Sequence, residues 1–211
     1  MDSVKISNNM LERMPIYLNY IKGLPKSTKN ISATKIANAL GFGEVSVRKD
    51  LAKVSDGGRC KLGYVCEELI NDIEEFLDIK HFMNAVIVGK GEFVKALLGY
   101  DGFSGSGVNI AAALDMERKE IHDIEEKETY PIRELKSFCK SHGIEIGIVM
   151  VPEENAQAAC DQLIEAGIEA IWNFTSVYLN VPENVAVHNE NIITSIIKLR
   201  MQMKEKSEAG L

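Results

Sequence analysis

"IVGKGEFVKAL", residues 87–97, decides the fold of the larger part of this chain. An apolar run enters a turn that contains Gly89 and Gly91, and the residues after the turn have the pattern of a helix. Glycines at these two places permit a tight turn and a close approach of the backbone to a pyrophosphate at the N-terminus of the helix. The order of strand, glycine turn and helix predicts the first unit of a dinucleotide-binding sheet.

Two residues of this turn depart from the usual G-x-G-x-x-G spacing. Val94 stands where a third glycine is expected and adds bulk where the helix must lie close to the strand. Glu92 brings a negative charge toward the expected phosphate position, which costs free energy unless the side chain turns away or pairs with Lys90. The turn therefore predicts a nucleotide site with an altered phosphate end.

Short apolar runs alternate with helical patterns as far as residue 190. The expected strands are 84–89, 108–115, 144–151, 168–174 and 184–189. The expected helices are 92–99, 132–143 and 154–167, with a loop between 115 and 132. Nearly continuous apolar strands separated by helices indicate an α/β domain, with a parallel sheet covered on both faces. The pattern thus predicts a doubly wound, Rossmann-type sheet with right-handed crossovers.

Ligands of such sheets bind beyond the carboxyl ends of the strands. Asp115 ends the second expected strand and is placed to accept hydrogen bonds from a ribose hydroxyl pair. Its charge would repel a 2′-phosphate, which favours an NAD-like ligand over an NADP-like one. We expect the nucleotide site at the glycine turn and the strand ends, in residues Gly89, Lys90, Gly91, Glu92, Phe93, Asp115, Met116, Val151, Pro152, Asn173 and Phe174.

The distribution of charge divides the chain into two parts. Residues 1–61 carry a net charge of +6, whereas the remaining 150 residues carry −13. A basic head on an acidic body predicts two modules with different partners. In the head, apolar side chains recur at helical spacing in 11–24, 31–42 and 44–54. Two short helices joined by a turn, with Ser32 as N-cap and Gly41 as C-terminal stop, predict a helix-turn-helix.

Residues 44–54 are the expected DNA-recognition helix. Val47, Leu51 and Val54 lie at i, i+4 and i+7 and are expected to be buried. The opposite face is expected to carry Ser46, Lys49, Asp50 and Lys53, with Arg48 beside it. Lysine and arginine on such a face neutralise phosphates and reach guanine edges in the major groove.

"SDGGRCKLGY", residues 55–64, has the pattern of a basic β-wing. Asp-Gly-Gly is a strong turn signal, and Arg59 and Lys61 alternate outward along the short strand expected after it. With the recognition helix, the wing predicts a double-stranded DNA operator as partner. The predicted DNA-binding residues are Ser46, Arg48, Lys49, Lys53, Arg59 and Lys61.

Two further helices complete the expected organisation. Residues 64–77 form an acidic amphipathic helix that packs the head and links it to the sheet. The helix of 191–206 has an apolar band too broad for one-sided packing, which predicts burial in a homodimer interface. The expected domains are therefore a winged helix over 1–80, a Rossmann domain over 81–190 and a dimerisation helix over 191–211.

The sequence argues against several other classes of protein. No apolar run approaches the roughly 20 residues that span a bilayer, and the N-terminus has no apolar signal core, so a cytoplasmic protein with reduced cysteines is expected. The four histidines, His81, His122, His142 and His188, show no metal-binding spacing, and we expect no metal. A small oxidoreductase with a helical head is the competing enzyme class, but it lacks any placed acid or base, so no catalytic residues are expected.

In this order, the parts resemble the Rex family of redox-sensing transcriptional repressors along nearly the whole chain. The matching stretches are "RMPIYLNYI", "VSVRKDL", "GRCKLGY", "LLGYDGF", "MVPEENAQAACDQLIEAGIEAIWNF" and "LNVPENVAV". The resemblance implies a homodimer with a swapped C-terminal helix. It also implies that NADH releases the operator and that NAD+ permits binding. Tyr100 takes the place of a family tyrosine near the nicotinamide.

The departures from the family pattern cluster around the ligand. The family turn G-A-G-N-L-G reads G-K-G-E-F-V here, the acidic residue before the last helix becomes Asn191, and a proline becomes Ser176. The leading hypothesis is a dimeric repressor that senses redox state through NAD(H). The alternatives are a repressor that binds another adenine dinucleotide such as FAD, and one that binds no ligand and uses the sheet only to dimerise.

Overall fold

The computed structural model describes residues 7–59, 62–103, 105–117, 122–124 and 127–208. The chain divides into two compact units, Met1–His81 and Phe82–Leu211. Each has its own apolar core, so the two are described separately.

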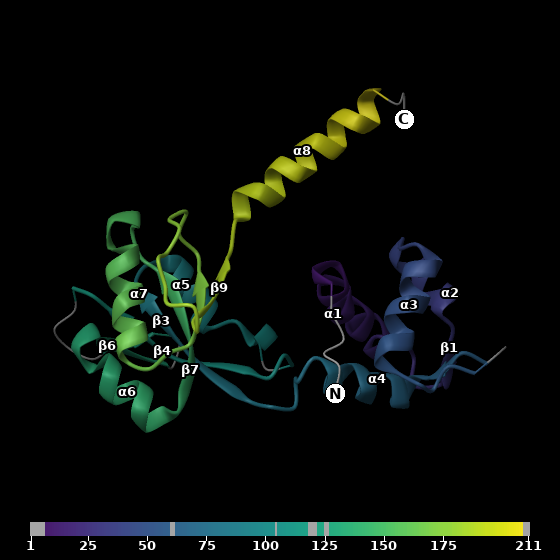
Figure 1. Cartoon of the computed structure of the whole chain (residues 1–211), viewed down its shortest axis with the longest axis horizontal. Helices are drawn as coiled ribbons and strands as arrows, with labels where there is room; N and C mark the ends of the chain where they lie inside the picture. The colour runs from purple at the N-terminus through teal and green to yellow at the C-terminus, as the bar shows by residue number, and fades with distance from the viewer. Residues whose placement is uncertain (1–6, 60–61, 104, 118–121, 125–126, 209–211) are drawn as a thin grey trace. The chain divides into compact units, whose positions relative to one another are not determined.

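In the described residues of the first unit, four helices accompany a two-stranded sheet (Figure 1). The helices are α1 (Asn8–Lys22), α2 (Ala33–Leu40), α3 (Glu44–Val54) and α4 (Cys66–Phe76), and the strands β1 (Asn30–Ile31) and β2 (Tyr64–Val65) pair antiparallel. The core is formed by fully buried side chains from these elements, among them Met14, Ile36, Leu51, Leu69 and Ile73.

The local signals of the helix-turn-helix are confirmed. The Ser32 hydroxyl accepts a hydrogen bond from the Lys35 backbone N–H at 3.1 Å, which caps α2. Gly41 ends α2 in the left-handed conformation, at φ 71°. A short turn then leads into α3, so α2 and α3 are the two helices of the motif.

The second unit contains a seven-stranded sheet in the order β5-β6-β4-β3-β7-β8-β9. Its strands are β3 (Met83–Gly89), β4 (Val108–Asp115), β5 (His122–Ile124), β6 (Lys127–Pro131), β7 (Ile144–Met150), β8 (Ala170–Asn173) and β9 (Ala186–Asn189). All neighbouring pairs are parallel except β5 and β6. β4 lies on one side of β3 and β7 lies on the other. The order in which successive strands are added to the sheet therefore reverses at β3, as in a doubly wound sheet.

The expected loop between 115 and 132 is wrong, because this segment contains β5 and β6. β6 pairs parallel with the end of β4, through Ala113–Thr129 and Asp115–Pro131, and so extends the sheet. Its sequence, "KETYP", has two charges and a proline in place of an apolar run. Such a strand is recognisable only from its pairing with a neighbour.

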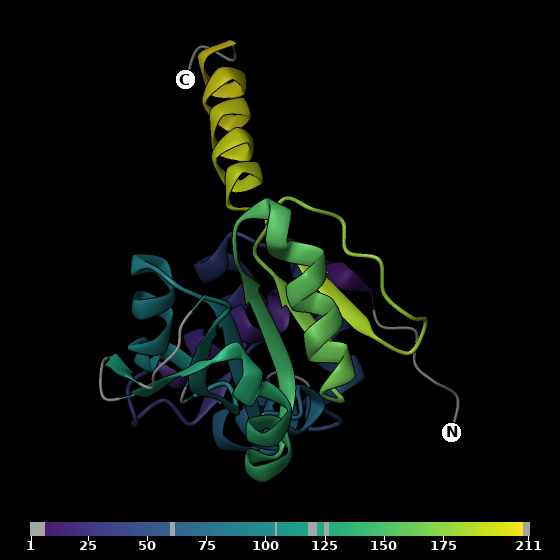
Figure 2. The same ribbon diagram turned by 90° about the vertical axis from the view of Figure 1, so that its left-hand side faces the viewer.

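Helices cover both faces of the sheet (Figures 1 and 2). α5 (Glu92–Leu98) packs with Ala85 and Ile87 of β3, whereas α6 (Leu135–His142) and α7 (Ala156–Glu165) pack with Val86 and Val88 on the other face. Alternate residues of β3 thus point to different cores. This burial on both faces explains the continuous apolar run before the glycine turn.

The last helix, α8 (Ile192–Glu208), buries none of its side chains in the single chain. Its large apolar side chains, Ile192, Ile193, Ile196, Ile197, Leu199, Met201 and Met203, are each between 51% and 71% exposed. Among the described residues, no helix is long and apolar enough to cross a membrane.

Candidate functional site

The outward face of α3 is the candidate DNA interface. Val47 and Leu51 are fully buried, as expected, and Ser46, Arg48, Lys49 and Lys53 are exposed. The expectation that Asp50 shares this exposed face is wrong, because its exposure is only 6%. The buried side of α3 is thus wider than the apolar spacing indicates.

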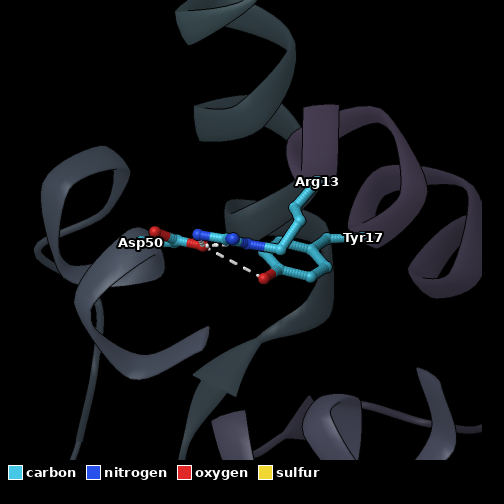
Figure 3. Close-up of polar contacts among 3 residues, drawn as sticks. All are labelled: Arg13, Tyr17 and Asp50. Carbon is cyan, nitrogen blue, oxygen red and sulfur yellow. Dashed lines mark hydrogen bonds and ion pairs between the residues drawn. The ribbon is translucent and has the colours of Figure 1, made fainter. Parts of the chain in front are cut away.

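Asp50 is buried because α1 supplies partners for its carboxylate (Figure 3). The Arg13 guanidinium donates to Asp50 Oδ2 from Nε at 2.8 Å, and the second nitrogen lies 2.7 Å from the same oxygen. The Tyr17 hydroxyl donates to that oxygen at 3.1 Å. Burial, with the hydrogen bond to and the charge of Asp50, raises the pKa of Tyr17 to about 12. This cluster ties the recognition helix to α1.

The basic residues around the wing border a groove. Arg59 forms an isolated antiparallel bridge with Gly63, just before β2. The groove runs along the start of α2, the middle of α3 and the segment before β2. It is lined by Ser32, Thr34, Arg48, Gly58, Arg59 and Tyr64, among others. Arg48 is paired with Glu44 one turn earlier on α3. Lys61, the other predicted wing contact, lies outside the described residues.

The glycine turn after β3 has the tight geometry that the sequence predicts. A Cβ on Gly89 would lie 2.2 Å from the Met150 carbonyl oxygen, because the end of β3 runs directly against β7. Gly91 has φ 105° and precedes the first residue of α5, and a Cβ there would meet nothing within 4 Å. Gly89 is therefore required by packing, whereas Gly91 lies at an open backbone turn that a phosphate can approach.

The two unusual residues of the turn, Glu92 and Val94, do not line the pocket that Gly89 and Lys90 border. Val94 is 1% exposed and packs with Ala85, Ile87 and Leu98 between α5 and the sheet. Glu92 is largely exposed and pairs with Lys95 at 2.7 Å, not with Lys90 as considered above. Neither side chain occupies the turn itself.

Lys90 instead bonds to Glu117, beyond the end of β4. This hydrogen bond raises the pKa of Lys90. Asp115, at the end of β4, is 8% exposed and its Oδ1 accepts from the Glu117 backbone N–H at 2.9 Å. A small pocket joins these parts and is lined by Gly89, Lys90, Asp115, Met116, Glu117, Val151, Pro152 and Asn155. Six of the expected nucleotide residues therefore meet at one site.

A row of aromatic rings lies beside this turn, and it contains three more of the predicted residues, Phe93, Tyr100 and Phe174. Phe93 contacts Phe174 edge to face, with ring centroids 5.7 Å apart. Phe174 then contacts Trp172, Trp172 contacts Phe103, and Phe103 contacts Tyr100, with centroids 4.6, 6.2 and 5.3 Å apart. Phe93 and Tyr100 are 49% and 61% exposed, so the row ends in two open apolar rings. Such rings offer a stacking surface to a planar ligand.

Asn173 is fully buried and its side chain is occupied by the loop that follows β8. Its amide nitrogen donates to the Val177 carbonyl and to Asn189 Oδ1, and its oxygen accepts from the backbone and hydroxyl of Thr175. This side chain shapes the loop and offers no free group to a ligand.

Three cysteines lie outside these two candidate sites. Cys66, Cys139 and Cys160 are free and buried, and burial raises the pKa of each thiol, that of Cys160 to about 11. No group of histidines, cysteines and carboxylates among the described residues could hold a metal ion. Cys60 lies outside the described residues.

Sequence reasoning missed residues that act through partners distant in the chain. Arg13 and Tyr17 meet Asp50 from 37 and 33 residues away. Glu117 and Trp172 also escaped notice, because neither belongs to a nucleotide motif. By contrast, the i,i+4 spacing of Glu44 and Arg48 could have predicted the ion pair that they form on α3.

Comparisons with known proteins cover both units. Residues 5–52 match the family described as "Putative DNA-binding protein N-terminus", and residues 80–177 match "CoA binding domain". Two curated relatives, both named redox-sensing transcriptional repressor Rex, come from Treponema denticola and Clostridium perfringens. They are 36% and 34% identical, over 93% and 92% of this chain and 94% and 92% of their own lengths.

Two solved structures are similar over nearly the whole chain. The structure of RSP in complex with β-NAD+ and operator DNA has a TM-score of 0.87 at 30% identity, and covers 99% of this chain and 97% of that one. The structure of RSP with β-NADH has a TM-score of 0.85 at 28% identity, covering 99% and 98%.

Proposed function

This chain belongs to the Rex family of redox-sensing transcriptional repressors, and on that premise we propose that it binds operator DNA through α3 and the wing and binds NAD(H) at the carboxyl end of its sheet. The observation that carries the proposal is the joint presence of both sites in one chain. An exposed basic recognition helix stands in the first unit, and a glycine turn with a strand-end aspartate stands in the second.

The DNA side of the proposal rests on charge and exposure. Arg48, Lys49 and Lys53 are exposed on α3, and Arg59 is exposed at the base of the wing. These side chains can reach phosphates and guanine edges when α3 lies in a major groove. Arg48 and Arg59 border the same groove, so both cations can face one stretch of the DNA backbone. Ser46 and Lys61 are the further contacts that we expect.

The nucleotide side rests on the open turn. The Gly91 backbone is free of steric obstruction, and neither Val94 nor Glu92 blocks it. Asp115 lines the same pocket as Gly89, which supports its proposed role as ribose ligand, and the rings of Phe93, Phe174 and Tyr100 support a nicotinamide subsite beside them. Met116, Val151 and Pro152 complete the wall. We therefore favour NAD(H) over an empty pocket, and no catalytic turnover is required.

We further propose that the protein is a homodimer in which α8 is buried. Two apolar surfaces are uncovered in the single chain: the broad band of α8, and the face of β7–β9 lined by Ile146, Ala170, Trp172 and Ala186. The indole N–H of Trp172 is buried and has no acceptor among the described residues. A second copy can cover both surfaces, and a dimer fixes the spacing of two recognition helices. A protein that acts on chromosomal DNA is expected in the cytoplasm.

The test of DNA binding starts from in vitro selection of duplex DNA with the wild-type protein. Affinity for the selected site is then measured by fluorescence anisotropy for the wild type and for the Arg48→Ala, Lys49→Ala double variant. We expect the variant to lose at least tenfold in affinity, because each base-reading contact contributes about 1–3 kcal/mol. Lys140→Ala, which removes a charge from α6 in the second unit, is the matched control.

Failure to enrich any sequence would contradict the proposal. So would equal affinity of the double variant and the control.

The nucleotide site is tested by equilibrium dialysis of the protein against increasing concentrations of NADH, NAD+ or FAD. Saturable binding of FAD without NADH would replace NAD(H) as the proposed ligand.

A further inference from the structure

The recognition helix carries an apolar side chain at the centre of its outward face. Val45, in the first turn of α3, is 65% exposed. Helical geometry of about 100° per residue sets Val45 roughly opposite the mean direction of the buried residues Val47, Asp50 and Leu51. Lys49 and Ala52 follow at i+4 and i+7 and are also exposed. The line of α3 that points farthest from the core is therefore Val45, Lys49 and Ala52.

Neither packing nor helix formation accounts for valine at this position. Val45 belongs to no core cluster and contributes nothing to the burial of the first unit. A β-branched residue also forms helix less readily than alanine or lysine. An exposed valine is unremarkable on a general surface, but this one stands between the cations Arg48 and Lys49 on the proposed DNA-binding face.

The major groove offers one apolar group to such a side chain. Thymine presents its C5-methyl group in the groove, next to acceptors and donors on the other bases, and apolar side chains contact it. The N-terminal residues of a recognition helix are those that reach base edges. Ala52 adds no bulk one turn beyond Lys49, so the helix can approach the groove floor closely.

We propose that Val45 is a specificity-determining residue that reads a thymine methyl group in each operator half-site. The inference rests on the proposed operator binding and adds a contact to it. Lys49 lies on the same line and binds a base edge or phosphate beside that thymine. Val45 then favours thymine over cytosine at this position, because cytosine lacks the methyl group.

The test replaces each thymine of the selected operator, one at a time in both half-sites, with deoxyuridine. This exchange removes only the methyl group and leaves Watson–Crick pairing intact. Anisotropy gives the affinity of the wild type, Val45→Ala and the control Ile16→Ala, which removes an exposed aliphatic side chain from α1. Thermal denaturation checks that all three proteins fold alike.

For the wild type we expect one thymine in each half-site at which the exchange weakens binding. The expected loss is about fourfold per methyl group, because burying one apolar carbon contributes about 0.8 kcal/mol. Val45→Ala should bind the unmodified operator more weakly and lose its sensitivity at that thymine alone, whereas Ile16→Ala should keep the wild-type profile. The proposal is overturned if no thymine is sensitive in the wild type, or if Val45→Ala keeps the full sensitivity. In both cases operator binding itself persists, which separates this failure from failure of the proposed function.

Discussion

Loss of the ion pair between Arg13 and Asp50 should strongly lower the free energy of unfolding of the first unit. Replacing Arg13 with methionine keeps the bulk of the side chain but leaves the Asp50 carboxylate with Tyr17 alone. Breaking a buried pair in this way costs about 3–5 kcal/mol. The Arg13 side chain is 21% exposed, so solvent screening favours the lower end, about 3 kcal/mol. For a domain of this size, that lowers the melting temperature by roughly 10–20 °C.

The assay must separate the two units. The only tryptophan, Trp172, lies in the second unit, so its fluorescence follows the unfolding of that unit alone. Far-ultraviolet circular dichroism follows both, and the transition absent from the fluorescence belongs to the first unit. Arg13→Met should shift this transition and leave the fluorescence transition in place.

Two further variants decide between a buried pair and a simple packing effect. Arg13→Met combined with Asp50→Leu removes both charges and should regain most of the lost stability. Glu44→Gln breaks the exposed pair with Arg48 and should cost less than about 1 kcal/mol. A loss below about 1 kcal/mol for Arg13→Met, or a double variant no more stable than Arg13→Met alone, would refute the reasoning.

Three other predictions follow from individual residues. Gly89→Ala should destabilise the second unit by roughly 1–3 kcal/mol and abolish NADH binding, because the new Cβ meets the Met150 carbonyl oxygen; unchanged binding by calorimetry would contradict the role of this turn. The pKa of Tyr17 is raised above its ordinary value of 10.0 to about 12, so the stability that its protonated hydroxyl contributes is complete below pH 10 and is lost between pH 10 and about 12. Tyr17→Phe should flatten the fall of stability over this pH range, and an unchanged slope would exclude Tyr17 as its source. Val94→Gly should cost about 2–3 kcal/mol without improving NADH affinity, since Val94 fills the core; a gain in affinity would show that its bulk restricts the ligand.

Much of the fold could be predicted because its signals are local. Ser32 and Gly41 bound α2 through contacts within a few residues. The apolar run before Gly89 reflects a strand buried on both faces. In contrast, β6 has no apolar run of its own, and only its pairing with β4 identifies it.

The candidate sites were predictable to the same extent. The glycine turn and Asp115 stand at the ends of consecutive strands, at a separation typical of nucleotide-binding sheets, and the structure brings them to one pocket. The burial of Asp50 depends on Arg13 and Tyr17 in another helix, and no periodicity indicates such a long-range pair. Because Asp50 is buried together with Val47 and Leu51, the outward line of α3 passes through Val45, whose position the apolar spacing alone does not indicate.

The central claim is that nicotinamide redox state and operator binding are linked in this one chain. A ligand shifts the DNA-binding state only by its differential affinity for the two states, and the coupling must be reciprocal. The most direct measurement is operator affinity at a fixed total concentration of NAD+ and NADH while their ratio is varied. We predict that operator affinity falls as the NADH fraction rises, and that bound operator weakens NADH binding by the same factor. Operator affinity that stays constant across all ratios, while NADH binds saturably, would contradict it.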